Sequence, residues 1–211
     1  MMAKKSVNKP KAVVLDYDDT IVGFLQGLCT IHNAIHGTNV SHRDVTSWNF
    51  DDLLIEDVNG NKVTGKQLRD TFKTYENNGL YVGLQPLQYA VPAVNDMIGR
   101  GYKIIIVTAR PEEYRKDTEL NAIWNGIKYD KLIFSNDKVK TLKSLRRKYN
   151  VVMFADDKYE TIEDVANNCG WIKHVCLING PHNRMIEIED EERIVRVEDL
   201  NFCLRELELL S

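Results

Sequence analysis

Three carboxylates and a hydroxyl follow one short apolar run near the start of the chain. The run 12–15 (AVVL) predicts a strand that is buried on both faces of a parallel sheet. Asp16, Asp18 and Asp19 come next, and Thr20 follows them. Carboxylates this close together repel one another unless a cation lies among them, and open α/β sheets bind ligands at the carboxyl ends of their strands. The stretch therefore predicts chemistry assisted by a cation at a strand end.

Aspartates after a strand also serve as turns or helix caps, because their side chains accept hydrogen bonds from backbone amides. For the stretch 11–20 taken alone, that alternative stays open. A second pair, Asp156 and Asp157, follows another apolar run, 151–155 (VVMFA). Turns alone do not easily explain two such clusters, whereas a divalent cation shared between neighbouring strands does.

A hydroxyl and a lysine follow two further strand-like runs. Thr108 comes after the run 103–107 (KIIIV) and just before a helix start at Pro111. A hydroxyl at a strand end, next to free amides at a helix start, predicts a phosphate or oxyanion seat, and a capping role for Thr108 is compatible with it. Lys138 stands at the start of a basic helix that runs to Tyr149, and most cations of that helix are expected to form a solvated face.

These residues need a framework, and the apolar pattern predicts one. Six runs predict strands: 12–15, 103–107, 132–134, 151–155, 174–178 and 193–197. Helices are predicted at 22–35, 66–77, 89–101, from 111 with Leu120, Ile123, Trp124 and Ile127 as its apolar face, at 137–149 and 162–169, and after Asp199 with Leu200, Cys203, Leu204, Leu207 and Leu210 buried. The fold class expected is α/β, a Rossmann-like parallel sheet flanked by helices, with a small helical cap inserted after the first strand. The division expected is a disordered leader at 1–10, a core at 11–20 and 90–211, and the helical cap at 21–89.

Composition narrows the classes of function. The 211 residues are 43% hydrophobic and 28% charged with a net charge of −3, which is ordinary for a globular protein and does not suggest a nucleic-acid coat protein. The chain contains no G-x-G-x-x-G, P-loop or G-x-S-x-G motif, which argues against dinucleotide binding, P-loop kinase activity and serine hydrolysis. No apolar run approaches a membrane span, and no apolar segment follows the basic start. We therefore expect a cytoplasmic protein whose four cysteines are reduced.

The motifs together resemble a known superfamily. DYDDT at 16–20, Thr108, a lysine at a helix start, and the pair 156–157 resemble, in this order, the four motifs of the haloacid dehalogenase-like hydrolases. Within that superfamily the chain is most similar to the 5′(3′)-deoxyribonucleotidases. Phe24 lies eight residues after Asp16, as an aromatic does in that family, and segments that look familial are 80–91 (LYVGLQPLQYAV), 136–138 (NDK) and 182–184 (HNR).

Three departures from the family pattern are informative. Position 19 is Asp where Gly is commoner, and Arg110 follows Thr108 and Ala109 where that family more often has a small residue. Arg110 could therefore serve a different substrate. The segment between the lysine and the second acid pair is longer than in the animal enzymes, which leaves Lys140 as a rival for the lysine role. We predict Lys138, because Lys140 lies about 200° further around the helix.

The resemblance implies Mg²⁺-dependent phosphoryl transfer through an aspartyl-phosphate. Asp16 would be the nucleophile and Asp18 the general acid and base. Asp16, the backbone carbonyl of Asp18, and Asp156 would hold Mg²⁺, with Asp157 orienting them. Thr108 and Lys138 would bind the phosphoryl oxygens and neutralise their charge in the transition state.

The resemblance also implies a nucleoside monophosphate as substrate, with 5′ or 3′ preference open. Residues expected to contact it are Phe24, Trp48, Tyr81, Ala109 and Arg110. Phe24 is expected to stack on the base, and simple packing of the cap helix is the alternative. The rival functions are a phosphatase of another small ester or of polynucleotide 3′-phosphate ends, and a non-catalytic metal- or phosphate-binding module. The expected partner is a small phosphate ester; a homodimer is left open, and neither a membrane nor a stable nucleic-acid complex is expected.

Overall fold

The computed structural model describes residues 9–50 and 53–208. It contains one six-stranded sheet in the order β5-β4-β1-β6-β7-β8, and every neighbouring pair is parallel. The strands are β1 (Lys11–Leu15), β4 (Lys103–Thr108), β5 (Lys131–Phe134), β6 (Asn150–Asp156), β7 (His174–Ile178) and β8 (Ile194–Val197). The six predicted strands and the Rossmann-like fold class are confirmed. Of the leader predicted at 1–10, residues 1–8 lie outside the described part, as does Leu210.

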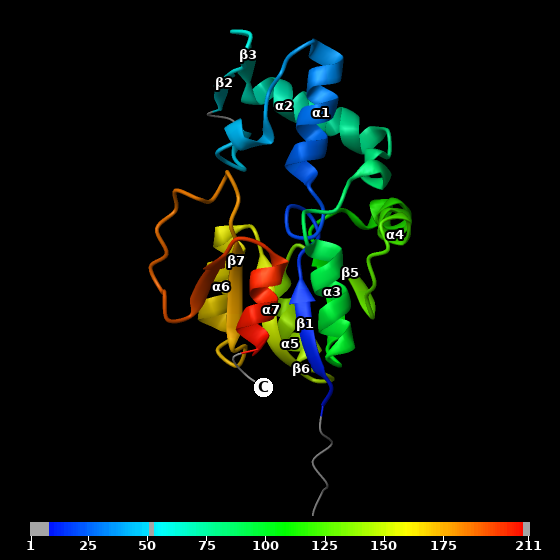
Figure 1. Ribbon diagram of the computed structural model, residues 1–211, viewed down its shortest axis with the longest axis vertical. Helices are drawn as coiled ribbons and strands as arrows, with labels where there is room; N and C mark the ends of the chain where they lie inside the picture. Colours follow the sequence, from blue (N-terminus) through cyan, green and yellow to red (C-terminus); the bar gives the residue numbers. More distant parts are fainter. Residues whose placement is uncertain (1–8, 51–52, 209–211) are drawn as a thin grey trace, which may run out of the picture.

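Helices cover both faces of the sheet. Alternate residues of β1 enter different cores: Val13 and Leu15 pack with one set of helices, Ala12 and Val14 with the other. On the first face lie α3 (Ala90–Gly99) and α7 (Leu200–Glu208), and on the second lie α5 (Lys138–Leu145) and α6 (Tyr159–Asn168). Figure 1 shows β1 in the middle of this arrangement, pointing toward the inserted segment. A strand buried on both faces needs an unbroken apolar run, which explains why β1 was predictable.

The segment between β1 and α3 lies over the carboxyl ends of the strands (Figure 1). It holds α1 (Phe24–His36), the 3₁₀ turn η1 (His42–Asp44), β2 (Leu54–Glu56), β3 (Lys62–Thr64), α2 (Gly65–Asn77) and the 3₁₀ turn η3 (Leu80–Gly83). We call residues 21–89 the insertion; its division from the core at these positions stays a prediction. The antiparallel hairpin β2–β3 was not predicted, because strands of three residues are too short for an alternating pattern to stand out.

One helix buries a different face from the predicted one. After the 3₁₀ turn η4 (Glu112–Tyr114), α4 (Arg115–Trp124) leaves Ile123 and Trp124 70% and 71% exposed, so the predicted apolar face is wrong there. The buried face carries Asn121 instead, whose side-chain amide donates to the backbone oxygens of Val82 and Leu84 at 2.8 and 2.7 Å. Hydrogen bonds to the end of the insertion, rather than apolar periodicity, therefore fix the rotation of α4.

Two further expectations concern the surroundings of the chain. Within the described part, the helices are all too short or too polar to cross a membrane. The four cysteines are free and buried, so they pack in the interior of the protein.

Candidate functional site

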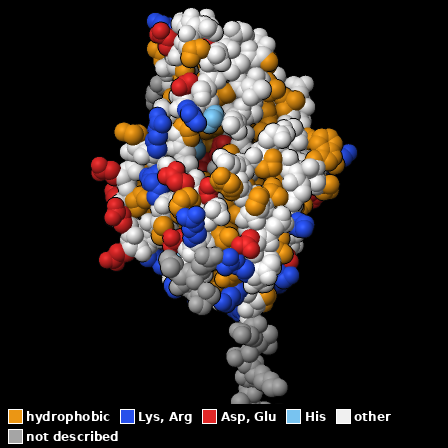
Figure 2. All heavy atoms as spheres, viewed as in Figure 1, with side chains coloured by type: hydrophobic (Ala, Val, Ile, Leu, Met, Phe, Trp, Pro, Cys, Tyr) orange, Lys and Arg blue, Asp and Glu red, His pale blue; other side chains and the backbone are white. Residues whose placement is uncertain are grey.

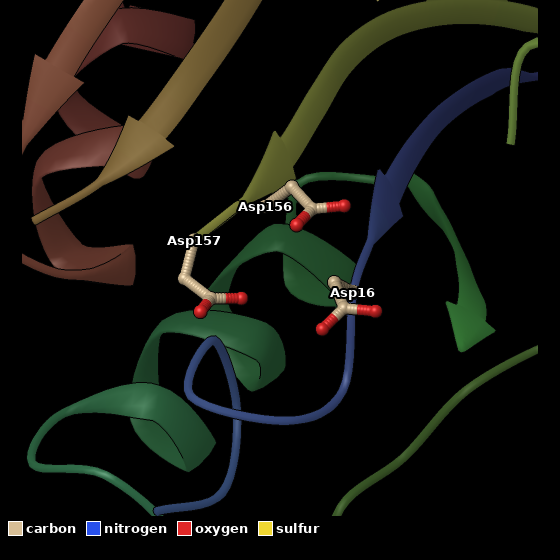
Figure 3. A group of neighbouring side chains, drawn as sticks. All are labelled: Asp16, Asp156 and Asp157. Atoms are coloured by element: carbon tan, nitrogen blue, oxygen red, sulfur yellow. The ribbon is translucent and has the colours of Figure 1, made fainter. Parts of the chain in front are cut away.

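Three carboxylates meet at the ends of two neighbouring strands. Asp16 follows β1, and Asp156 and Asp157 lie at the end of β6. The parallel pairing of β1 with β6 brings them together, because the Asp16 amide donates to the Ala155 carbonyl at 2.9 Å. Each of the three side chains offers an oxygen within 4.8 Å of the others. Figure 3 shows the carboxylates gathered around a common space.

Lys138 supplies a positive charge inside this cluster. It is the first residue of α5, and its ammonium donates to Asp16 and, at 2.7 Å, to Asp156. Burial lowers the pKa of Lys138, but the carboxylates of Asp156 and Asp16 outweigh that effect and hold it above the ordinary value. The Lys140 side chain is exposed, and its backbone amide donates to the side chain of Asp137, the N-cap of α5. The structure thus brings Lys138, and not Lys140, to the acids.

The residues present fit a divalent cation. Three carboxylates and one ammonium leave two formal negative charges uncompensated in a buried cluster. Burial raises the pKa of Asp16 well above its usual range, Lys138 opposes this, and Asp156 and Asp157 add to it. Carboxylate oxygens are the ligands that Mg²⁺ prefers, and few protein ligands suffice because Mg²⁺ keeps several waters. Asp157 belongs to this set of potential ligands, whereas its predicted role was only to orient the others.

Asp18 is held by a buried arginine. Arg110 donates to both oxygens of the Asp18 carboxylate, from Nε at 2.8 Å and from an Nη at 2.6 Å. Its other Nη donates to Thr118 at 2.9 Å, and the guanidinium carbon lies 4.7 and 4.1 Å from the ring centroids of Tyr17 and Tyr81. A bidentate pair of this kind fixes the carboxylate in direction as well as position. Arg110, where the resembled family more often has a small residue, thus orients Asp18, the predicted general acid.

Asp19 serves as a turn and helix cap, which was the alternative role considered for the aspartates after β1. Its carboxylate accepts from the Leu25 amide at 3.1 and 3.2 Å, in the first turn of α1. Its φ of +48° places it in the left-handed region that Asp tolerates better than most residues. Asp19 therefore caps α1 and turns the chain, whereas Asp16 and Asp18 face the site.

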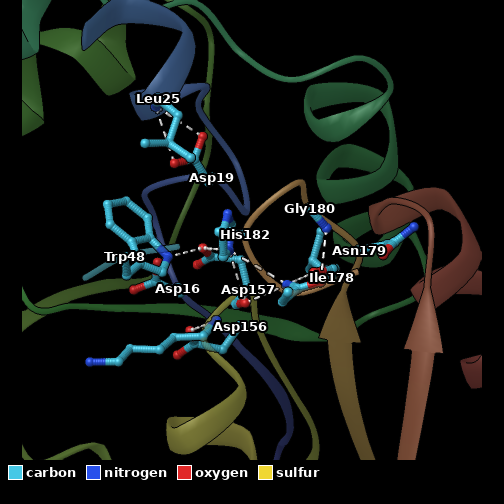
Figure 4. A network of polar contacts seen from close by, with 12 residues as sticks. Asp16, Asp19, Leu25, Trp48, Asp156, Asp157, Ile178, Asn179, Gly180 and His182 are labelled. Carbon is cyan, nitrogen blue, oxygen red and sulfur yellow. Dashed lines mark hydrogen bonds and ion pairs between the residues drawn. The ribbon is translucent and has the colours of Figure 1, made fainter. Parts of the chain in front are cut away.

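Asp157 connects the insertion, the sheet and the loop after β7. Its Oδ2 accepts from Trp48 Nε1 at 3.1 Å and lies 2.8 Å from His182 Nε2. Its backbone oxygen accepts from the side-chain amide of Asn183 at 2.6 Å. Figure 4 shows this network between Trp48, Asp157 and the 178–182 segment. His182 and Asn183, noted only as familial, thus hold a potential metal ligand in place.

A cavity of about 380 Å³ opens above these groups. The insertion contributes Phe24, Trp48, Phe72, Glu76 and Tyr81 to its lining. The core contributes Asp16, Asp18, Ala109, Arg110, Pro111, Asn136, Lys138, Asp156, Asp157, Lys158 and Thr161. The cavity therefore has an acid and lysine floor and a largely aromatic wall. A second cavity, of about 330 Å³, lies at the same junction between insertion and sheet, where Figure 2 shows a hollow with acidic side chains in it.

The aromatic wall is packed as well as exposed to the cavity. Phe24 is only 4% exposed and stacks on Trp48, with ring centroids 5.8 Å apart. It also contacts Phe72 edge-on at 5.3 Å and Tyr75 at 5.7 Å. Phe24 thus lines the cavity and packs the insertion at once. Its stacking on a base stays a prediction.

The predicted site residues differ in how they reach the cavity. Phe24, Trp48, Tyr81, Ala109 and Arg110 all line it. Thr108 is fully buried and is not among the lining residues; its hydroxyl accepts from the Arg110 amide at 3.2 Å. Its contact with a phosphoryl group stays a prediction.

Sequence reasoning missed two lining residues on α2. Phe72 and Glu76 lie four residues apart on a helix that was predicted, and that spacing places them on one face. The signal was present, but nothing local indicates which face of the helix meets the sheet. Long-range packing of α2 against α1 and η3 decides it.

Comparisons with known proteins support the fold. No family model matches the chain, and no curated protein matches it. Among solved structures it is similar to a predicted phosphoglycolate phosphatase from Haemophilus somnus 129PT, with a TM-score of 0.63 and 15% identity over 97% of this chain and 100% of that one. It is also similar to the L-2-haloacid dehalogenase of Xanthobacter autotrophicus, with a TM-score of 0.60 and 13% identity over 96% and 100% of the two chains.

A third similar structure is a haloacid dehalogenase-like hydrolase from Streptococcus pneumoniae, with a TM-score of 0.62 and 11% identity over 94% of this chain and 98% of that one. At such identities the likeness shows the fold alone. This chain has the α/β fold of the haloacid dehalogenase-like hydrolases. The finer resemblance to deoxyribonucleotidases stays a prediction.

Proposed function

We propose that this protein is a Mg²⁺-dependent phosphatase that hydrolyses nucleoside monophosphates, at the 5′ or 3′ position, through an aspartyl-phosphate. One observation carries the proposal: a single cavity joins a buried cluster of acids and a lysine to an aromatic wall. The acids and the lysine suit a phosphoryl group with its metal ion, and the aromatic wall suits a flat base. The fold shared with solved phosphatases is compatible with this chemistry but does not carry it.

The proposed reaction assigns a role to each residue near the floor. An oxygen of Asp16 attacks phosphorus, and the bond from phosphorus to the ester oxygen breaks as Asp18, in its protonated form, gives that ester oxygen a proton. Water then attacks the aspartyl-phosphate, and Asp18 takes back a proton as inorganic phosphate leaves. Lys138 neutralises charge on the phosphoryl oxygens, with Thr108 as a further donor. Mg²⁺, held by Asp16, Asp156 and Asp157 with the Asp18 carbonyl, would supply charge neutralisation at the transferred group.

The choice of nucleotides rests on the aromatic wall. Base–aromatic stacking is worth about 1–3 kcal/mol per base in nucleic-acid complexes. Phe24, Trp48 and Tyr81 place three such rings around one cavity. The volume of about 380 Å³ falls within the range of small-molecule sites. A small sugar phosphate would leave this wall largely unused, which favours a substrate with a base.

A phosphatase screen tests the proposal. Wild-type protein and Asp16→Asn are assayed with Mg²⁺ on an aryl phosphate, deoxynucleoside 5′- and 3′-monophosphates and sugar phosphates. We expect wild type to turn over the aryl phosphate and the nucleotides, and Asp16→Asn to be inactive yet folded. Activity that survives complete chelation, or a wild-type rate in Asp16→Asn, contradicts the mechanism.

Phe24→Ala separates the nucleotidase from a general phosphatase. If Phe24 stacks on the base, kcat/KM should fall about tenfold to a hundredfold for nucleotides and little for the aryl phosphate, which matches the stacking energy above. If Phe24 only packs the insertion, kcat/KM should fall by the same factor for the nucleotides and for the aryl phosphate. Equal losses would favour a phosphatase of another small ester.

A second candidate function concerns polynucleotide 3′-phosphate ends. It is favoured by α5, which begins at Lys138 in the site and carries the exposed Lys140 and Lys143, with the exposed Arg147 just beyond its end. Such a row could bind a phosphate backbone. In that case an oligonucleotide 3′-phosphate would be hydrolysed much faster than a mononucleotide, and the advantage would shrink steeply as salt is raised.

A further inference from the structure

Glu76 is an unusual member of the cavity lining. Among the described residues that the insertion contributes, it is the one charged side chain, and the other four are aromatic. It lies on α2, one turn after Phe72, and it is half-buried. A carboxylate in an aromatic wall is costly to bury without donors, so its presence calls for a partner.

The neighbours of Glu76 place it away from the reacting groups. Arg110 holds Asp18 and stacks on the Tyr81 ring at 4.1 Å, and the Tyr81 hydroxyl donates to Glu76 Oε1 at 3.3 Å. This row therefore runs from Asp18 through Arg110 and Tyr81 to Glu76 along one side of the cavity. Glu76 lines the same cavity as the acids, so a ligand with its phosphate at the acids and its other end along this row would meet Glu76.

The second oxygen of Glu76 is available to a ligand. Within the described part of the chain, the Tyr81 hydroxyl is its one hydrogen-bond donor, and it reaches Oε1. Burial raises the pKa of Glu76 above its ordinary value, against the hydrogen bond from Tyr81. A carboxylate in this setting favours a neighbouring N–H donor and disfavours a carbonyl oxygen.

We propose that Glu76 selects nucleotides whose base presents an amino group, namely cytosine, adenine and guanine, over uracil and thymine. The inference rests on the nucleotidase function proposed above. A carboxylate accepts from the cytosine N4 amino group, which uracil replaces with a carbonyl oxygen. In adenine and guanine, N6 and N2 offer equivalent donors. The carbonyl of uracil or thymine would instead face an acceptor, which leaves both groups without a partner.

Cytidylate and uridylate form the sharpest pair of substrates, because they differ in that one group and its neighbouring ring nitrogen. We expect wild type to favour deoxycytidine over deoxyuridine monophosphate by about tenfold in kcat/KM, the scale of one well-placed base contact. Glu76→Gln should bring the ratio close to one, because an amide both donates and accepts. Glu56→Gln, the same change at an exposed position of β2, should keep the wild-type ratio.

A purely structural role for Glu76 would appear differently. If Glu76 only anchors the Tyr81 hydroxyl, Glu76→Gln and Tyr81→Phe should each lower kcat/KM by the same factor for both nucleotides. The ratio of the two kcat/KM values should then stay unchanged. Under the proposal, Tyr81→Phe keeps the preference for cytosine even where the rate falls. Melting temperatures of both variants check that each remains folded.

Two results would overturn the inference. A wild-type ratio near one, or an unchanged ratio in Glu76→Gln, shows that Glu76 does not read the base although the protein is a nucleotidase. Hydrolysis of the aryl phosphate with no turnover of either nucleotide overturns the nucleotidase function itself, and this inference with it. The two failures are thus distinguished by whether any nucleotide is hydrolysed.

Discussion

Lys138 neutralises part of the negative charge of the acid cluster. Its ammonium contacts Asp16 and Asp156, all three groups being 8% exposed or less. Removing one partner from a buried ion pair leaves an uncompensated charge, which is typically destabilising by about 3–5 kcal/mol. The same ammonium is the nearest described cation to the proposed nucleophile, so it would serve catalysis and stability together.

Comparing Lys138→Met with Lys140→Met tests this assignment. We expect Lys138→Met to lower kcat on an aryl phosphate by about a hundredfold or more, the usual effect of losing one transition-state donor. Methionine keeps the packing, so the variant should fold with a lower melting temperature. Lys140→Met should remain close to wild type in both respects, because its side chain is exposed. A larger loss of kcat at position 140 reverses the assignment.

At the residue scale, local motifs predicted the floor of the site but not its supports. Asp16, Lys138 and Asp156 each stand at the junction of a strand or helix, where the pattern of the chain marks them. The pair of Arg110 with Asp18 joins residues 92 positions apart, and Trp48 reaches Asp157 across 109. Contacts over such separations depend on how the elements pack, which no single stretch encodes.

The insertion is tied to the sheet by polar contacts at the site itself. Trp48 donates to Asp157, and the Tyr81 ring covers the Arg110 guanidinium. Asp19, on the sheet side, caps the first turn of α1. The position of the aromatic wall and the orientation of the acids are therefore coupled through a few hydrogen bonds.

Replacing Trp48 with phenylalanine isolates one of these bonds. The ring can still stack on Phe24, but the N–H to Asp157 is lost. Because hydrogen bonds to charged groups are worth about 1.5–3 kcal/mol, we expect kcat/KM on an aryl phosphate to fall about tenfold or more. The aryl phosphate is chosen because it reports on the acids and not on base stacking.

Trp124→Phe is the matched control, since Trp124 is 71% exposed on α4. It should leave kcat/KM and the melting temperature unchanged. If Trp48→Phe behaves like Trp124→Phe, the hydrogen bond to Asp157 contributes nothing to the reaction.

At the element scale, the strands were predictable and the faces of some helices were not. β1, β4, β6 and β7 each hold a run of apolar residues because helices cover both sides of the sheet. The rotation of α4 depends on Asn121, a polar residue that an apolar pattern ignores. Glu76 was missed for the same reason, since its environment comes from Tyr81 and not from its own helix.

Across the whole molecule, the parallel sheet concentrates negative charge at one edge. Parallel strands end on the same side, so the acids after β1 and β6 meet although about 140 residues separate them in the chain. Two formal negative charges remain after Lys138 is counted. The fold holds these charges together, while in the unfolded chain they lie apart and in water. A divalent cation should therefore bind the folded state far better than the unfolded one.

That difference predicts that Mg²⁺ stabilises the protein without any substrate. At a concentration of about 100 times its dissociation constant, a ligand specific for the folded state adds about 2.7 kcal/mol to the free energy of unfolding. For a chain of this length that corresponds to an increase of about 5–10 °C in melting temperature. Asp156→Asn should lose most of the increase, because it removes one carboxylate from the cluster, whereas Asp164→Asn, an exposed change on α6, should keep it. Melting curves with Mg²⁺ and with a chelator make the measurement, and an equal shift in both variants would place the stabilising ion somewhere other than among these acids.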